Sequence, residues 1–307
     1  MLFQPRYKNR IPRFNSNRRD KEMIKMVDIT LGHTPDADDA FMFYALVSGK
    51  LESIFVIKHF IQDIETLNRR ALKHELDVTA VSAHAYAHLK DYVILKSGGS
   101  FGLKYGPIVI TRKENMMMTT TTSPAQLENA TIAIPGKLTS ANLLLKLAVG
   151  KFKEKVVSFE RIPDAVARGN VDAGLVIHEA QIAYDKTKFA SALDLGRWWS
   201  DNTSNLPVPL GINVASTRTM SIDKIKEFSN LFTKSIKYGL ENADAALDYA
   251  MQFGRGQPKE TIRKFVKMYV NNLTLDMGHE GKKALERMFE MAKAQKMLES
   301  DIQIVVI

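Results

Sequence analysis

The chain has 307 residues, 45% of them hydrophobic and 25% charged, which is the composition of an ordinary globular protein of one or two domains. It has no cysteine, which excludes disulfides, thiolate catalysis and metal sites built on cysteine. Residues 1–25 hold eight Lys or Arg against two acids and so supply +6 of the net charge of +9. The remaining +3 is too small to indicate a nucleic-acid surface, and no apolar run approaches the roughly 20 residues that insert into a membrane.

Residues 1–26 form a basic tail that we expect to be disordered, because it shows no apolar periodicity. The tail lacks the apolar segment of a secretory signal, and this favours a cytoplasmic protein. Two explanations of the tail stay open. It is rich in arginine like an organelle transit peptide, and it is also compatible with an upstream extension of the gene model, since Met23 and Met26 precede the first expected strand.

From residue 27 onward, short β-branched runs alternate with helical patterns, which predicts an α/β protein with largely parallel sheets. The expected strands are residues 27–32, 54–60, 77–83, 106–113, 131–136, 154–159, 171–178, 191–196, 209–217 and 302–307. The expected helices are residues 35–50, 61–74, 84–91, 139–150, 162–170 and 179–186, and most of the chain from residue 221 to 300.

Two stretches share one pattern, HELDVTAVSAHAYAHL from residue 74 and GNVDAGLVIHEAQIAY from residue 169. Each has a polar turn, an aspartate, a strand of small residues and a short helix, so we expect one copy in each of two domains. Ligands of open α/β sheets bind beyond the carboxyl ends of strands, which predicts Ser82 and His178 on opposite walls of a cleft. Domain 1 is then residues 27–113 plus 209–307, and residues 114–208 form an inserted domain 2 with an exposed loop at the low-complexity run 116–122.

Three aspartates lie at the start of the helix expected after the first strand, in the stretch GHTPDADDAF. Thr34 suits the N-cap of this helix, and carboxylates are favoured in a first helical turn, which accounts for Asp36 and Asp38. Asp39 lies three residues before Met42, so we expect it to face the cleft. A Mg²⁺ or Ca²⁺ site would need further oxygen ligands, and no second acidic cluster is present, so no metal site is predicted.

His178 follows directly on a buried-looking strand, in AGLVIHEAQ. A histidine at a strand end can act as a general base near neutral pH, and a structural histidine is the equal alternative at this point. The motif lacks the second histidine of a His-Glu-x-x-His zinc helix. His84 and His88 have the spacing of metal ligands on a helix, but no third ligand accompanies them.

The stretch IPGKLTSANLLL, residues 134–145, reads as a strand, a glycine turn and a helix. The N–H groups of Ser140 and Ala141 at such a helix start would bind an anion. An ordinary N-cap formed by Thr139 or Ser140 is the alternative.

Several stretches taken together resemble the menaquinone-biosynthesis family of the futalosine pathway, more closely its 1,4-dihydroxy-6-naphthoate synthases than its chorismate dehydratases. The stretches are TPDADDAFMFYAL, IETLNRRAL, KSGGSFGLKYGPIVITR, GLVIHEAQIAYDK, LDLGRWWSDNT and LPVPLGINVAS. Many members read Ser-Pro-Cys-Pro-Asn-Asp-Thr-Phe where this chain has TPDADDAF, so an acid replaces the amide at Asp38.

The resemblance implies the two-domain fold of type II periplasmic binding proteins. It also implies a cofactor-free lyase that converts cyclic dehypoxanthine futalosine, a small carboxylate, to 1,4-dihydroxy-6-naphthoate. His178 matches the general base of the family, and Asn68, Ser82, Ser140 and Ala141 match positions that contact the substrate. The competing hypothesis is a solute-binding protein that uses the same fold to hold a small carboxylate without chemistry. The sequence carries no indication of an oligomeric state.

Overall fold

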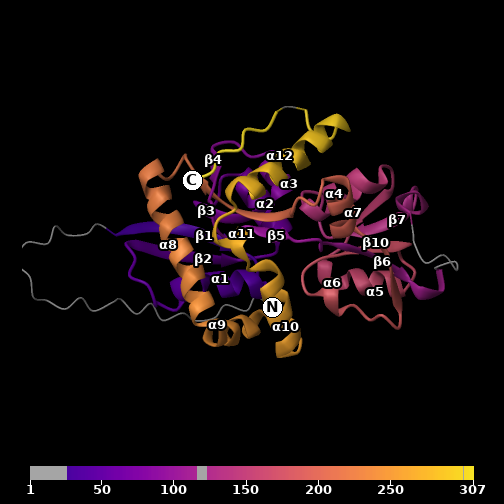
Figure 1. Ribbon diagram of the computed structural model, residues 1–307, viewed down its shortest axis with the longest axis horizontal. Coiled ribbons are helices and arrows are strands. Elements are labelled where there is room, and N and C mark those ends of the chain that lie inside the picture. Colours follow the sequence, from indigo (N-terminus) through magenta and orange to yellow (C-terminus); the bar gives the residue numbers. More distant parts are fainter. Residues whose placement is uncertain (1–25, 116–122, 300) are drawn as a thin grey trace, which may run out of the picture.

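The computed structural model describes residues 26–115, 123–299 and 301–307. The predicted disordered tail and the predicted loop at 116–122 therefore lie outside the described residues, apart from Met26. Figure 1 shows two lobes side by side, each built around its own sheet. The predicted α/β class with two domains is confirmed. Among the described residues, none of the helices combines the length and the hydropathy needed to span a bilayer.

The first domain contains a six-stranded sheet in the order β2-β1-β3-β11-β4, with β5 also paired to β11. Its strands are β1 Val27–His33, β2 Phe55–Ile61, β3 Val78–Ser82, β4 Tyr92–Ile94, β5 Ser100–Gly102 and β11 Val208–Ser216. Its helices are α1 Ala37–Val47, α2 Ile64–Leu72, α3 Ala83–Tyr86, α8 Ile222–Glu241, α9 Ala243–Ala250, α10 Lys259–Tyr269, α11 Asn272–Leu275 and α12 Gly278–Ala294, with the 3₁₀ turn η4 Met251–Phe253.

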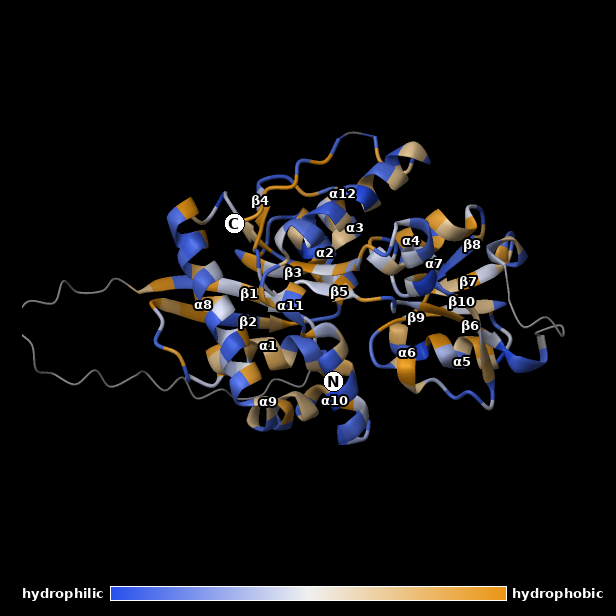
Figure 2. Cartoon of the chain, viewed as in Figure 1, coloured by the Kyte–Doolittle hydropathy of each residue, from blue (hydrophilic) through white to orange (hydrophobic). Residues whose placement is uncertain are grey.

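The second domain contains a five-stranded sheet in the order β10-β6-β9-β7-β8. Its strands are β6 Ile108–Arg112, β7 Thr131–Ile134, β8 Lys153–Val156, β9 Ala173–Val176 and β10 Phe189–Asp194. Its helices are α4 Ser140–Val149, α5 Ile162–Ala167, α6 Ala180–Ala183 and α7 Leu195–Asn202, with the 3₁₀ turns η1 Lys113–Asn115, η2 Pro124–Leu127 and η3 Phe159–Arg161. The apolar cores combine residues of the strands with those of the inward helix faces, and the edge strand β8 is mainly hydrophilic (Figure 2).

The sheets are mixed, where the sequence predicted largely parallel ones. β1 is parallel to β2 and β3, and β7 is parallel to β8 and β9, but β11 and β6 run antiparallel to the neighbours with which they pair. β6 and β11 are the strands by which the chain enters one domain from the other. Neither strand is joined to a neighbour in its sheet by the strand–helix–strand crossover that makes two strands parallel. This explains why they run antiparallel although the sequence predicted largely parallel sheets.

The first domain boundary also differs from the prediction. Residues 108–112 pair with β9 and β10 of the second sheet, so this domain begins after Pro107 rather than at residue 114. Backbones approach closely at this crossing, since a Cβ added to Gly196 would lie 2.2 Å from the carbonyl carbon of Tyr105. A Cβ on Gly106 would lie 3.1 Å from the Cα of Gly196, so glycine is required at Gly196 and a side chain at Gly106 would be tightly placed.

The C-terminal residues 302–307 extend the edge of the first sheet without forming the regular strand that was predicted. Val306 makes an isolated bridge to Ile94 of β4. The N–H of Ile94 donates to the carbonyl of Val305 at 2.8 Å, and the N–H of Ile307 donates to the carbonyl of Ile94 at 2.8 Å.

Candidate active site

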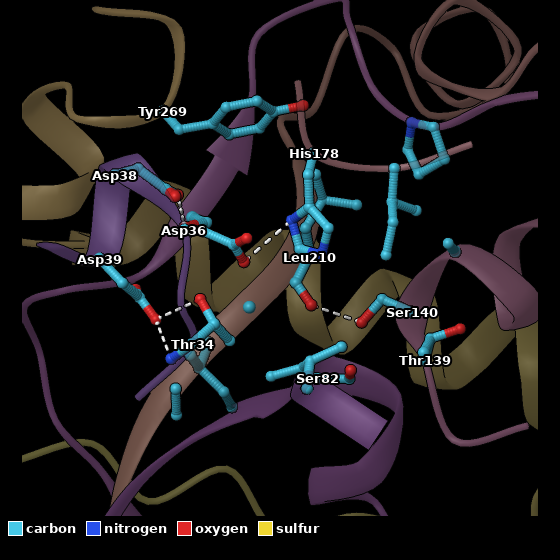
Figure 3. A pocket seen from close by; sticks show the side chains of 18 of the residues that line it. Thr34, Asp36, Asp38, Asp39, Ser82, Thr139, Ser140, His178, Leu210 and Tyr269 are labelled. Carbon is cyan, nitrogen blue, oxygen red and sulfur yellow. Dashed lines mark hydrogen bonds and ion pairs between the residues drawn. The ribbon is translucent and has the colours of Figure 1, made fainter. Parts of the chain in front are cut away.

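A pocket lies between the two domains, beyond the carboxyl ends of β1, β3 and β9 (Figure 3). Its empty space is about 690 Å³, including the solvent at its mouth. The start of α1, the end of β3 and the strand β11 form one wall, and the start of α4 and the residues after β9 form the other. The lining side chains include Thr34, Asp36, Asp38, Asp39, Ser82, Ser100, Thr139, Ser140, Ala141, His178, Gln181, Asn213 and Tyr269.

His178 stands two residues after the buried strand β9, where the sequence predicted it. Its backbone has φ 56°, a left-handed conformation that costs a non-glycine residue about 1–3 kcal/mol and persists where its surroundings hold it. The ring of Phe159 meets the imidazole edge to face, with 4.9 Å between ring centroids. On its other side, Nδ1 lies 3.0 Å from Oδ2 of Asp36 in the opposite domain.

Asp36 occupies the N-cap position of α1, but its carboxylate makes no cap hydrogen bond. It points instead to His178 and to Arg255, whose Nη2 lies 2.5 Å from Oδ1 (Figure 3 shows the His178 contact). Burial raises the pKa of Asp36, but the charges of His178 and Arg255 outweigh burial and lower it overall. Asp36 is therefore an ionised carboxylate at neutral pH, and the interpretation of it as a helix-start residue alone is wrong.

This pairing assigns different roles to the two imidazole nitrogens of His178. A carboxylate at hydrogen-bond distance accepts the Nδ1 proton and so selects the tautomer in which Nε2 carries a lone pair. Nε2 is then the nitrogen that can take a proton from a ligand in the pocket. The arrangement is that of an oriented general base.

Asp38 and Asp39 line the same pocket in a different state of charge. Burial raises the pKa of Asp39 to about 7, and its Oδ2 accepts from the N–H and Oγ1 of Thr34 at 2.8 and 2.7 Å. Burial, followed by the charges of Asp39 and Asp36, raises the pKa of Asp38 well above its ordinary value, and Ser100 Oγ lies 3.2 Å from its Oδ2. Asp38 is therefore held towards its neutral form, in which a carboxyl group can donate a hydrogen bond.

Ser82 ends β3 on the wall opposite His178, as the repeated pattern predicted. Asn68 lies behind Ser82 rather than among the lining residues, and it is fully buried. Its Nδ2 donates to Ser82 Oγ at 3.0 Å, and its Oδ1 accepts from the Ser82 N–H at 2.8 Å. Asn68 therefore positions Ser82.

The start of α4 faces the pocket with Ser140 and Ala141. Thr139 is the N-cap, and its side chain accepts from the N–H of Asn142 at 3.2 Å. Ser140 Oγ donates to the carbonyl of Leu210 on β11 at 2.5 Å, across the domain boundary. The structure shows the N-cap formed by Thr139, which was one of the two alternatives. The first N–H groups of a helix have no intrahelical partner, so those of Ser140 and Ala141 could also bind an anion, and this stays a prediction.

Residues 29–294 match the family model described as menaquinone biosynthesis. The chain belongs to this family. It is 38% identical over 272 residues to a 1,4-dihydroxy-6-naphtoate synthase of Thermus thermophilus, covering 88% of this chain and 96% of that protein. A protein of the same name from Streptomyces coelicolor is 29% identical over 279 residues, which cover 88% and 94% of the two chains.

Solved structures support the same fold. A crystal structure of a protein from Archaeoglobus fulgidus is 45% identical, with a TM-score of 0.81 over 88% of this chain and 98% of that one. The periplasmic aliphatic sulphonate binding protein of Escherichia coli is 13% identical, with a TM-score of 0.60 over 90% and 95% of the chains. The periplasmic-binding-protein fold expected for a menaquinone-biosynthesis family member is therefore confirmed.

Two residues beside the pocket were not predicted from the sequence. Arg255, from the loop before α10, pairs with Asp36, and Tyr269, at the end of α10, lies 2.8 Å from Gln181 through its hydroxyl. A lone arginine between two glycines, in FGRGQP, is the signal that could have indicated Arg255.

His84 and His88, which have the spacing of metal ligands on a helix, do not form part of a metal site among the described residues. The rings of His84 and His88 lie 5.3 Å apart between centroids, and within the described ranges no group of three side chains is arranged to hold a metal ion.

Proposed function

We propose that this chain is a 1,4-dihydroxy-6-naphthoate synthase, a carbon–carbon lyase of menaquinone biosynthesis that acts on cyclic dehypoxanthine futalosine. The family and the activity named for two full-length relatives support this proposal. The single observation that carries it is the contact of 3.0 Å between His178 Nδ1 and Asp36 in the pocket wall. That contact gives the site a base, which a lyase needs and a protein that only binds a solute does not.

In the proposed reaction, Nε2 of His178 takes a proton from the substrate. The electron pair released in this way forms a new π bond as a carbon–carbon bond breaks. The electron pair of the broken bond goes to the departing fragment, which takes up a proton from the imidazolium and leaves as a second product, while the naphthoate gains its aromatic ring. General-base catalysis of this kind contributes about 10²–10⁴-fold in rate. These steps need no external oxidant or reductant, and the proton taken by His178 is returned, so the proposal includes no cofactor.

The rest of the pocket suits a substrate with one carboxylate. We propose that the N–H groups of Ser140 and Ala141 bind this carboxylate at the start of α4. Ser82 Oγ, held by Asn68, would contact a substrate hydroxyl. Asp38 is held towards its neutral form, so it adds little repulsion of an anion and can donate a hydrogen bond.

The competing hypothesis of a solute-binding protein is supported by the fold alone. The sulphonate-binding neighbour has 13% identity, and fold does not determine function.

The test is a comparison of His178→Asn with the wild type on cyclic dehypoxanthine futalosine. We expect kcat to fall by roughly 10²–10⁴, because the variant lacks a base at this position. His279→Asn, an exposed histidine on α12, is the matched control and should retain wild-type kcat. A His178→Asn variant with near wild-type kcat would refute the proposed base.

A further inference from the structure

The two domains touch on both sides of the pocket, and the two contacts differ in kind. On one side α4 packs against α3 and α12, and Ala83, Leu144 and Leu285 of these helices belong to one buried apolar cluster. On the other side α6 contacts α10, where Ile182 packs against the apolar cluster of the first domain, and a group of ion pairs centres on Arg255, in the loop between η4 and α10. An apolar contact stays together by excluding water, whereas buried charges regain their hydration when the contact between them opens.

The guanidinium of Arg255 binds both domains at once. In the first domain, Nη2 donates to the carbonyl of Pro35 at 2.9 Å and lies 2.5 Å from Asp36 Oδ1. In the second domain, Nη1 lies 2.8 Å from Glu179 Oε2, and the plane of the group lies over the Phe159 ring, 4.8 Å from its centroid. The fixed fork of an arginine suits such a two-sided contact, and the single ammonium of a lysine does not.

The two carboxylates that Arg255 joins are nearly inaccessible to water. The Asp36 and Glu179 side chains are 3% and 6% exposed, and that of Arg255 is 24% exposed. Without the guanidinium, the closed arrangement would hold two carboxylates in the same buried region with one fewer cation. Removing one partner from buried charges leaves the others uncompensated, which favours the hydrated, open arrangement.

Arg255 also lies 3.6 Å from the exposed Glu160 through Nε, but its three other side-chain partners are all neighbours of His178. Asp36 holds the imidazole, Glu179 is the next residue along the chain, and Phe159 covers the imidazole edge. The left-handed backbone at His178 needs such support from its surroundings. Arg255 is not among the residues that line the pocket between the domains. It lines a second, neighbouring groove together with Phe159 and Glu179, so it can support His178 without contacting a ligand in the pocket.

We propose that Arg255 is an interdomain latch, a positioning residue that ties Asp36 to Glu179 and so holds His178 against Asp36 when the cleft is closed. The apolar contact of α4 with α3 and α12 is the side that stays together while the latch side opens. The activity readout of this proposal rests on the proposed function, and its distance readout does not.

The chain has no cysteine, so a thiol-reactive spin label attaches only at cysteines that are introduced for the test. Ala245→Cys on α9 and Arg168→Cys after α5 are both exposed, belong to different domains, and flank the latch side (Figure 1). Spin labels at these positions report the interdomain distance by pulsed electron resonance. In the labelled protein without ligand, Arg255→Met should shift the distribution to longer distances, and kcat of the unlabelled variant should fall at least tenfold.

The matched control is Arg263→Met, because Arg263 lies on α10 and pairs with Asp244 and Glu260 of its own domain. Its distance distribution and kcat should equal those of the wild type. Arg255→Lys, which keeps the charge without the fork, should give an intermediate shift and serves as the second variant if Arg255→Met does not fold. A merely structural ion pair would lower the melting temperature and leave both the distances and kcat unchanged, and that result would overturn the latch.

Discussion

Nδ1 of His178 in the second domain lies 3.0 Å from Oδ2 of Asp36 in the first, so each half of the pair comes from a different sheet. The contact therefore exists only when the domains are together. This relationship makes domain closure and the orientation of the base one event. Closure also excludes water from the site, which strengthens the electrostatic interactions within it.

Replacing Asp36 with asparagine should lower kcat by about 10²–10⁴, with a small change in KM. The amide has no charge to stabilise the imidazolium that forms, and it can donate to Nδ1 and so select the opposite tautomer. Steady-state kinetics with cyclic dehypoxanthine futalosine measures the effect. A kcat within twofold of the wild type would show that Asp36 does not orient the base.

Replacing Ser140 with proline should raise KM by roughly 10–100-fold, since a hydrogen bond to a charged group is worth about 1.5–3 kcal/mol. Proline is tolerated at the first position of a helix and removes its N–H, and Thr139, with ψ 144°, already has the backbone favoured before proline. Ser140→Ala is the control, because it also loses the hydroxyl but keeps the N–H. Equal KM values for the two variants would contradict carboxylate binding at this N–H.

Replacing Asp39 with asparagine should stabilise the protein more at pH 8 than at pH 5. Burial raises the pKa of Asp39 to about 7 from 3.8, so the folded protein holds this proton more tightly than the unfolded chain does. The stability associated with the protonated carboxyl is therefore lost as pH rises through this window. An asparagine Oδ1 can accept both hydrogen bonds from Thr34 without ionising.

Thermal unfolding of the wild type and Asp39→Asn at the two pH values is the measurement. A change on the order of 1 kcal/mol in the free energy of unfolding shifts the melting temperature of a chain of this size class by about 2–4 °C. Asp201→Asn, an exposed position on α7, is the control. If the melting-temperature gain of Asp39→Asn is the same at both pH values, the carboxyl is not held protonated by the fold.

The alternation of strands and helices was sufficient to predict the two sheets, and the repeated pattern was sufficient to place Ser82 and His178 on facing walls. These features depend on local periodicity. The role of Asp36 could not be predicted, because its partner Arg255 lies 219 residues along the chain and meets it only after the C-terminal helices pack on α1. In a single helix start, Asp36, Asp38 and Asp39 look equivalent. Burial raises the pKa of all three, and their states of charge differ because only Asp36 lies beside His178 and Arg255, whose charges lower its pKa.

The central claim is tested most directly by incubating the purified protein with cyclic dehypoxanthine futalosine and following both substrate and product by chromatography with mass detection. The account predicts that the substrate disappears over many turnovers and that 1,4-dihydroxy-6-naphthoate accumulates in equal amount without an added cofactor. Saturable binding of the substrate with no formation of the naphthoate would contradict the account and would favour a solute-binding protein.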